Sequence, residues 1–241
     1  MEKTLVILAA LAIQVKVAFS QQLITNGDFE QLDSCPKYVG DIQVAHGWHN
    51  GGMTPDLFST CTNGHENGLN IPDNYAGSKK SINGNCYAGI VLFTKRLQSP
   101  DKKNYELNES IWTNLAVPTS LGKVYELKFW VAPADSSYFT SKYITATLSA
   151  NSFNEKESNT VQVLIISIED ESVSLDGWKK VSMTFTSDKN WRYISIGLLR
   201  NVFSYKQYLY SIDKNKLKKG HSSEMVCYYY IDNISLLEIG N

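Results

Sequence analysis

The side chains with the clearest ligand-binding chemistry are aromatic. Sugars pack the apolar faces of their rings on Trp and Tyr, while amides and carboxylates take the hydroxyl groups. One candidate set lies on the polar faces of strand-like segments: Trp130, Tyr143, Trp191 and Tyr193. A second set lies in an irregular region: Trp48, Asp56 and Asn74. Because Trp is highly buried on average, packing is the competing interpretation for each ring.

The loop set has a structural alternative. Trp48 would stack on a pyranose ring, and Asp56 and Asn74 would exchange hydrogen bonds with its hydroxyls. Alternatively, Trp48 and Phe58 pin the irregular region onto the rest of the fold, and Asp56 caps the turn after Pro55. The alternatives predict different effects of Trp48→Ala on the free energy of unfolding. Loss of a buried Trp costs about 3–5 kcal/mol, whereas a surface change costs little.

Histidines and acids form no recognisable catalytic or zinc motif. His46 and His49 flank Trp48, and His65 precedes Glu66, but the spacing fits no zinc motif. The acids of "IEDES" at 168–172 are typical of a solvated turn rather than of a glycosidase pair. The sequence lacks a G-x-S-x-G elbow, a phosphate loop and a dinucleotide fingerprint. We therefore expect no enzyme activity and no catalytic residue.

The elements that must position the candidate side chains are β-strands. "KVYELKFWVA" alternates, with Tyr125, Leu127 and Phe129 on one face and Trp130 on the other. The same period of two recurs in "KYITATLSA", "KKVSMTFTS" and "WRYISIGLL", and "VQVLIISI" is a continuous apolar run. No helical period is sustained between these segments, which predicts an all-β sandwich.

The N-terminus has the pattern of a secretory signal peptide. Lys3 precedes a long apolar run, and small residues end at Ser20 with cleavage-site spacing. A retained anchor is the alternative, because Lys16 is a late charge for a leader. We expect residues 1–20 to be the signal peptide and residues 21–241 to be one domain, secreted or held at the outer surface. The formal net charge of −1 argues against nucleic-acid binding.

Four cysteines remain after cleavage, namely Cys35, Cys61, Cys86 and Cys227. No CxxC pair exists, export permits disulfides, and four cysteines allow three pairings. We predict that Cys35 pairs with Cys61, which would tie the irregular region to itself. Cys86 and Cys227 would then form the remaining pair.

The chain ends in "YYYIDNISLLEIGN", which places a carboxylate in an apparent final strand. Tyr229 and Ile231 have one parity and Ile234 and Leu236 the other, so the inward face switches at Asp232-Asn233. A switch of this kind indicates a β-bulge. An unpaired buried charge is costly, so Asp232 either faces water or has a cationic partner.

Several motifs in order resemble the jelly-roll carbohydrate-binding modules of the galactose-binding-like superfamily. These are "NGDFE" at 26–30, "WKKVSMTF" at 178–185, "YISIG" at 193–197 and "YIDNISL" at 230–236. Within 31–88, "SCP", "TPDLF", "IPDN" and "CYAGI" are similar to a variant found in secreted and outer-surface bacterial proteins, with Met53 and Leu57 departing from it. The resemblance covers most of residues 23–238 and implies a jelly-roll β-sandwich with a loop-rich insertion after the first strand.

The resemblance also implies a site and a function. In such modules the first and last strands lie side by side and often hold a structural calcium ion, which takes six to eight oxygen ligands. Carried over, Glu30 and Asp232 would be ligands, with Asp28 as a weaker candidate on the same side of the strand. The implied function is non-catalytic carbohydrate binding. The alternative is a structural or adhesive module that contacts other cell-surface components.

Overall fold

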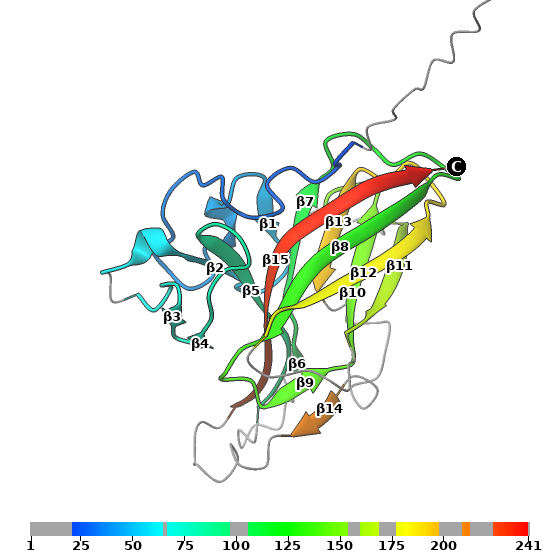
Figure 1. Cartoon of the computed structure of the whole chain (residues 1–241). Coiled ribbons are helices and arrows are strands. Elements are labelled where there is room, and N and C mark those ends of the chain that lie inside the picture. The colour runs from blue at the N-terminus through cyan, green and yellow to red at the C-terminus, as the bar shows by residue number, and fades with distance from the viewer. Residues whose placement is uncertain are drawn as a thin grey trace, which may run out of the picture.

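A computed structural model describes residues 21–64, 67–96, 106–153, 160–168, 177–197, 209–212 and 224–240. The predicted signal peptide, His65, Glu66 and the acids at 169–172 lie outside these residues. Two antiparallel sheets face each other across one apolar core (Figure 1). The structure is therefore the jelly-roll type of β-sandwich that the sequence predicts.

Each sheet is antiparallel throughout. The first sheet has five strands in the order β1 (Trp48–Asn50), β7 (Ser110–Asn114), β13 (Tyr193–Gly197), β10 (Tyr143–Ser149) and β11 (Val161–Ser167). The second, six-stranded sheet has the order β12 (Lys179–Thr186), β8 (Val124–Pro133), β15 (Glu224–Gly240), β5 (Cys86–Arg96) and β2 (Asp56–Ser59), with β6 (Glu106–Leu107) paired to β5. The outer face of the six-stranded sheet is turned to the viewer in Figure 1.

Short elements complete the described part of the chain. Two small antiparallel pairs join β3 (Asp73–Asn74) to β4 (Gly77–Ser78) and β9 (Phe139–Ser141) to β14 (Leu209–Ile212). The 3-10 turns η1 (Ile42–Val44) and η2 (Thr60–Thr62) lie in the irregular region. Within the described residues, no helix is long and apolar enough to cross a membrane.

The alternation in the sequence accounts for the core. In β8, Tyr125, Leu127 and Phe129 are buried, whereas Lys128 and Trp130 are partly exposed. The inward residues of β10 and β13 are likewise fully buried: Ile144, Ala146, Leu148, Ile194 and Ile196. Because side chains of period two alternate between faces, each strand turns one apolar face to the space between the sheets. The outward residues of β10 and β13, namely Thr145, Thr147 and Ser195, are buried as well, so of these three strands only β8 alternates between buried and partly exposed side chains.

The predicted bulge in β15 is confirmed. The register with β8 shifts between Asp232 and Ser235, and Asn233 has φ of 53°. Ile231 faces the core before the shift and Ile234 after it. The extra residue thus keeps apolar side chains on the inner face along the whole strand.

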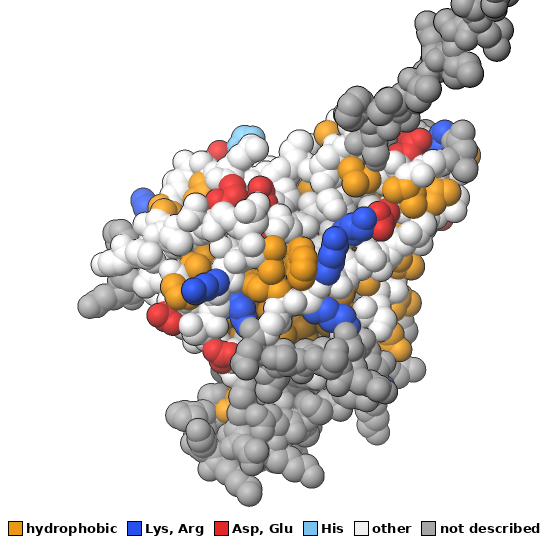
Figure 2. All heavy atoms as spheres, viewed as in Figure 1, with side chains coloured by type: hydrophobic (Ala, Val, Ile, Leu, Met, Phe, Trp, Pro, Cys, Tyr) orange, Lys and Arg blue, Asp and Glu red, His pale blue; other side chains and the backbone are white. Residues whose placement is uncertain are grey.

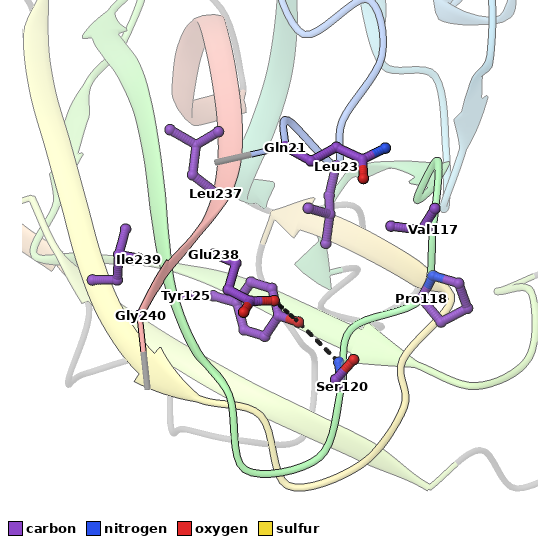
Figure 3. Close-up of a pocket in the computed structure, with 10 residues that line it drawn as sticks. All are labelled: Gln21, Leu23, Val117, Pro118, Ser120, Tyr125, Leu237, Glu238, Ile239 and Gly240. Atoms are coloured by element: carbon purple, nitrogen blue, oxygen red, sulfur yellow. Dashed lines mark hydrogen bonds between the residues drawn. The ribbon is translucent and has the colours of Figure 1, made fainter. Parts of the chain in front are cut away.

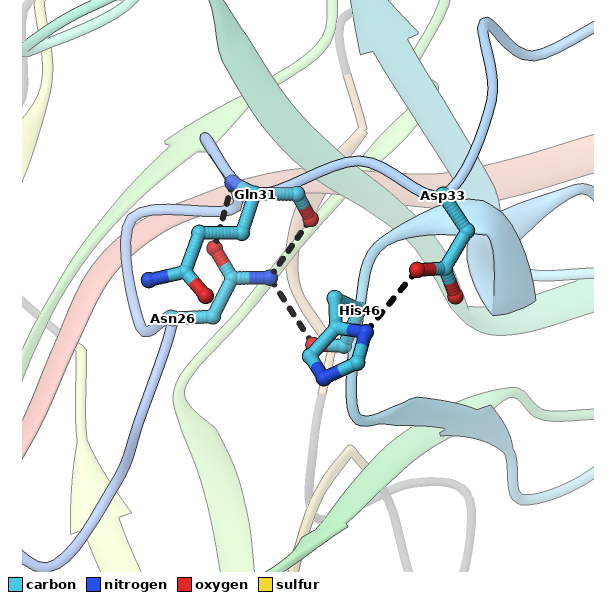
Figure 4. Close-up of polar contacts among 4 residues, drawn as sticks. All are labelled: Asn26, Gln31, Asp33 and His46. Atoms are coloured by element: carbon cyan, nitrogen blue, oxygen red, sulfur yellow. Dashed lines mark hydrogen bonds and ion pairs between the residues drawn. The ribbon is translucent and has the colours of Figure 1, made fainter.

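The opening segment is a turn, which corrects the expectation of a strand through Asp28 and Glu30. Residues 25–28 form a turn, and Phe29 has φ of 61°. The Asn26 side chain holds this turn: its Oδ1 accepts from Gln31 N–H at 2.8 Å, and its Nδ2 donates to the carbonyls of Gln31 and His46 (Figure 4). Strand alternation therefore says nothing about where Asp28 points. The segment before the turn does lie beside the last strand, since Leu23 N–H donates to Leu236 O at 2.9 Å.

The irregular region covers part of the outer face of the six-stranded sheet. A second apolar cluster fills the space between them, made of Phe58, Leu69, Ile71, Ala76, Tyr87, Ala132, Ala134, Tyr228 and Tyr230. The predicted Cys35–Cys61 disulfide is confirmed, with the two Cα atoms 6.0 Å apart. The predicted Cys86–Cys227 pair is wrong, because both are free and buried. Cys86 instead faces the Ser59 hydroxyl, at 3.3 Å.

Candidate functional site

The outer face of the six-stranded sheet has a covered part and an uncovered part. Tyr228 and Tyr230 of β15 point to this face, whereas Tyr229 between them joins the main core. Tyr87 from β5 packs on Tyr230, with ring centroids 5.0 Å apart. The irregular region closes over these rings, so the covered part is a packed layer and not a binding surface.

Asp56 and Asn74 belong to this covered layer. The Asp56 carboxylate accepts hydrogen bonds from the hydroxyls of Tyr75 and Tyr228 and from Gly40 N–H. It is 1% exposed, and burial raises its pKa. Asn74 accepts from the Tyr230 hydroxyl at 2.8 Å and donates to that of Tyr87 at 2.9 Å. Both predicted sugar ligands are therefore occupied in fastening the irregular region to the sheet.

The uncovered part carries two indole rings. Trp130 of β8 is partly exposed and lies opposite Lys180 of β12 in the strand register. Trp178 is also partly exposed and lies just before β12, where it packs against the second apolar cluster on this same sheet face. Because it is two residues from Lys180, the register partner of Trp130, it is a diagonal neighbour of Trp130. Its ring packs edge-on against Tyr87 at 5.6 Å, and its Nε1 donates to Lys80 O at 2.7 Å. These contacts fix Trp178 at the border of the covered layer.

Charged side chains surround the two indoles. The Lys180 ammonium lies 6.0 Å from the centre of the Trp130 ring. Lys128, two residues before Trp130 on the same face, forms an ion pair with Glu126. Figure 2 shows hydrophobic side chains gathered over the middle of this sheet face, with lysines beside them. We call the surface formed by Trp130, Trp178 and their charged neighbours the indole face. The charged neighbours are Lys80, Glu126, Lys128 and Lys180.

The burial of Trp48 and Trp191 corrects their assignment as sugar-stacking rings. Trp48 is 1% exposed, packs against Phe29 at 4.9 Å and donates from Nε1 to Asn26 O at 2.8 Å. Trp191 is fully buried, and its Nε1 donates to Gln162 Oε1 and Asp188 Oδ1. The packing alternative holds for both rings, since a buried indole offers no face to a ligand.

Tyr193 lies on the outer face of the five-stranded sheet, away from Trp130, whereas Tyr143, at the start of β10, packs against the main core. Both are partly exposed. Tyr193 packs edge-on against Trp112, which also stacks on the His49 ring at 4.2 Å and contacts the Phe153 ring at 6.1 Å. Trp112 is itself 4% exposed. The structure thus places Trp130 and Tyr193 on opposite surfaces of the sandwich.

The predicted calcium ligands come from two ends of the chain. The Glu30 carboxylate accepts from Asn85 and Cys86 N–H at 2.7 and 2.8 Å. Asp232 is fully buried and accepts from Ile82 N–H at 3.1 Å and Asn233 N–H at 2.7 Å. Burial is the main cause that raises the Asp232 pKa to about 7, and the negative charges of Glu30 and Asp28 contribute to this rise.

The carboxylates fit a calcium ion in chemistry but do not form a ready site. No lysine, arginine or histidine among the described residues forms an ion pair with Asp232. A cation would therefore relieve both its burial and its repulsion from Glu30. However, the described residues contain no group of three or more His, Cys, Asp or Glu side chains close enough to hold a metal. Backbone carbonyls would have to supply most of the ligands.

A hollow of about 560 Å³ lies at the other end of β15, beside the first described residues (Figure 3). Its lining includes Leu23, Pro118, Leu237 and Ile239. The Tyr125 hydroxyl accepts from Ser120 N–H at 2.9 Å and donates to Glu238 at 3.4 Å. With a largely apolar lining and a buried Tyr125 ring, this hollow suits a sugar less well than the indole face.

Sequence reasoning missed Trp178 and Lys180 as members of a site. The signal was present, because Trp178, Lys180, Ser182 and Thr184 share the parity opposite the inward residue Val181. The sequence does not show that β12 pairs with β8, and only this pairing brings Trp178 next to Trp130.

No family model matches this sequence, and no curated protein matches it. Among solved structures, the chain is similar to a xylanase fragment from Clostridium thermocellum that contains a CBM22 module (10% identity, TM-score 0.40). The alignment covers 80% of this chain and 26% of that one. It is also similar to the K3 adhesin domain of Lys-gingipain from Porphyromonas gingivalis (11% identity, TM-score 0.37, covering 91% and 99%). A third is a structure titled as a CBM4 module (12% identity, TM-score 0.33, covering 90% and 99%).

Proposed function

We propose that this chain is an exported, non-catalytic module that binds carbohydrate on the indole face. The observation that carries the proposal is the pair of partly exposed indoles on the uncovered part of this sheet face, next to charged side chains. The remaining aromatic side chains of this sheet face are buried under the irregular region. The Cys35–Cys61 disulfide supports an oxidising, extracellular location.

The chemistry follows from the arrangement of rings and charges. A sugar ring would lay its C–H face on Trp130, where the ring gains contact area without losing a hydrogen bond. Glu126 would accept from sugar hydroxyls, and Lys128 and Lys180 would donate to them. A sheet positions these groups rigidly, so little conformational entropy is lost on binding.

A glycan array followed by one matched pair of variants tests this function. Wild-type protein should retain at least one glycan, and Trp130→Ala should lower that retention at least tenfold. Its melting temperature should stay within a few degrees, because a partly exposed ring contributes little to folding. Tyr193→Ala, on the opposite sheet, is the control and should bind as wild type.

Two results would contradict the proposal. If no glycan is retained by the wild type, the structural or adhesive alternative takes its place. Exposed apolar side chains of the irregular region, among them Tyr38, Val39 and Met53, favour that alternative as a protein-binding surface. If Tyr193→Ala loses binding and Trp130→Ala does not, the sugar site lies on the five-stranded sheet.

We further propose that a structural calcium ion binds Glu30 and Asp232, with Asp28 near it. The buried, uncompensated Asp232 supports this proposal. Calcium at 100 times its dissociation constant should stabilise the fold by about 2.7 kcal/mol. The melting temperature should therefore rise with calcium and fall with a chelator. Asp232→Asn should abolish this response, and Asp33→Asn, an exposed control, should keep it. If a chelator leaves the melting temperature of the wild type unchanged, the calcium proposal is wrong.

A further inference from the structure

The indole face carries more positive than negative charge on its surface. Lys80 and Lys180 are exposed, and neither forms an ion pair with a described residue. Lys128 and Glu126 neutralise each other as a pair.

Two further acids lie in the region of the indole face. Asp232, opposite Trp130 in the register, is fully buried and hydrogen-bonded to backbone N–H groups. Asp135 is exposed and accepts at 2.8 Å from the N–H of Ser78, two residues before Lys80. The exposed ammonium groups of Lys80 and Lys180 therefore outnumber the one exposed carboxylate that is not already in the Lys128–Glu126 ion pair.

The two ammonium groups belong to residues that neighbour different indoles. Lys180 lies beside Trp130, with its Nζ 6.0 Å from the ring centre. Lys80 lies beside Trp178, whose Nε1 binds the Lys80 carbonyl at 2.7 Å. Since Trp178 and Trp130 are diagonal neighbours, a sugar chain that crosses both rings would pass Lys80 and Lys180 in turn.

A neutral sugar would make little use of these groups. An ammonium group is strongly hydrated. A hydrogen bond to a sugar hydroxyl compensates only part of the hydration free energy that the ammonium loses on binding. A carboxylate or sulfate substituent offers a charge-assisted hydrogen bond, which is about twice as strong as a neutral one. The surplus of lysines next to stacking rings therefore fits a ligand with both a sugar face and negative charge.

We propose that the glycan bound on the indole face is anionic, bearing uronate carboxylates or sulfate esters that pair with Lys80 and Lys180. This inference rests on the proposed function, since it names the class of sugar that the same site takes. It adds a separate prediction: the protein binds the charged form of a polysaccharide more tightly than the neutral form, and Lys80 and Lys180 cause the difference.

Matched polysaccharide pairs test the inference. Polygalacturonate, alginate and λ-carrageenan are each compared with their carboxyl-reduced or desulfated forms by affinity electrophoresis. At low salt the wild type should bind at least one anionic form about tenfold or more tighter than its neutral partner. Because salt screens exposed charges, this ratio should fall at 0.5 M NaCl.

The variants connect this preference to the site. Lys80→Gln and Lys180→Gln should each weaken binding of the anionic form by about two- to fivefold, in line with exposed ion pairs. Trp130→Ala should weaken binding of both forms. Lys37→Gln removes an exposed lysine from the irregular region and should change nothing.

The outcomes separate the two proposals. Equal binding of a charged and a neutral form, lost in Trp130→Ala, would overturn the anionic preference and leave sugar binding intact. Anionic binding that survives Lys80→Gln/Lys180→Gln or Trp130→Ala would also overturn it, because the charge would be recognised elsewhere. Binding of neither form, together with an empty glycan array, would remove both proposals.

Discussion

Glu109 is a buried carboxylate that links three parts of the chain. Placed just before β7, it accepts from Thr54 N–H and the Thr54 hydroxyl through one oxygen, at 3.0 and 3.2 Å. The other oxygen accepts from Val91 N–H at 2.7 Å. Burial raises the pKa of Glu109 from 4.5 to about 7, although these hydrogen bonds lower it. Glu109 therefore joins the irregular region to β5 at an electrostatic cost.

This cost predicts a pH dependence of stability. The folded pKa lies above the unfolded one, so the folded state binds more protons between about pH 4.5 and pH 7. Stability should thus fall as the pH rises through this window, by up to about 3 kcal/mol from Glu109 alone. In Glu109→Gln the loss between pH 5 and pH 8 should be smaller by that amount, measured by urea unfolding. Equal losses in the two proteins would show that Glu109 does not titrate there.

Residue burial was predictable from the sequence only within a regular strand. Trp130 lies in β8, where alternation puts it outside, and the structure agrees. Trp191 precedes β13, so its spacing from Ile194 does not predict to which face of the sheet its side chain points. Trp48 begins the short β1, and its burial depends on Phe29, nineteen residues earlier and in a turn. Such contacts leave no periodic signal in the sequence.

Two elements meet where the opening turn approaches the bulge of β15. Gly27 O accepts from Ile234 N–H at 2.8 Å, which satisfies an amide that the bulge removes from the regular ladder. A Cβ atom at residue 27 would lie 1.8 Å from Ile234 O. The close approach therefore requires glycine, and it places Asp28 and Glu30 near Asp232.

Gly27→Ala should consequently destabilise the fold by about 3 kcal/mol, since one of two backbones has to move. The control is Gly177→Ala, because no described residue other than its chain neighbours comes within 4 Å of a Cβ at residue 177. Thermal unfolding of the two variants measures the difference. A Gly27→Ala protein as stable as Gly177→Ala would mean that the turn does not sit on the bulge.

The bulge and the turn differ in how well the sequence predicts them. The bulge was predictable because it shifts the parity of apolar residues within one strand, from Ile231 to Ile234. The turn was not, because the side chain of Asn26 replaces strand pairing with hydrogen bonds to Gln31 and His46. Asn and Gly do favour turns, which was the available signal at Asn26-Gly27.

At the scale of the whole molecule, the irregular region adds a partial third layer to the sandwich. It is held by the ring cluster around Phe58, by the Asp56 hydrogen bonds and by the Cys35–Cys61 disulfide. This layer decides which aromatic residues of the six-stranded sheet remain available to a ligand. The sequence predicted the region and its disulfide, but not the sheet face that it covers, because that depends on contacts between distant segments.

The thiol content of the molecule tests this arrangement. Cys86 and Cys227 are free and buried, so native protein should react with no thiol reagent, and unfolded, unreduced protein should show two reactive thiols. Removing the disulfide by Cys35→Ser/Cys61→Ser should cost about 3 to 4 kcal/mol, because it closes a 26-residue stretch of the unfolded chain. The same double variant should react as two thiols when unfolded. Four thiols in the unreduced wild type would mean that the irregular region is held by packing alone, and none would mean that Cys86 and Cys227 are paired after all.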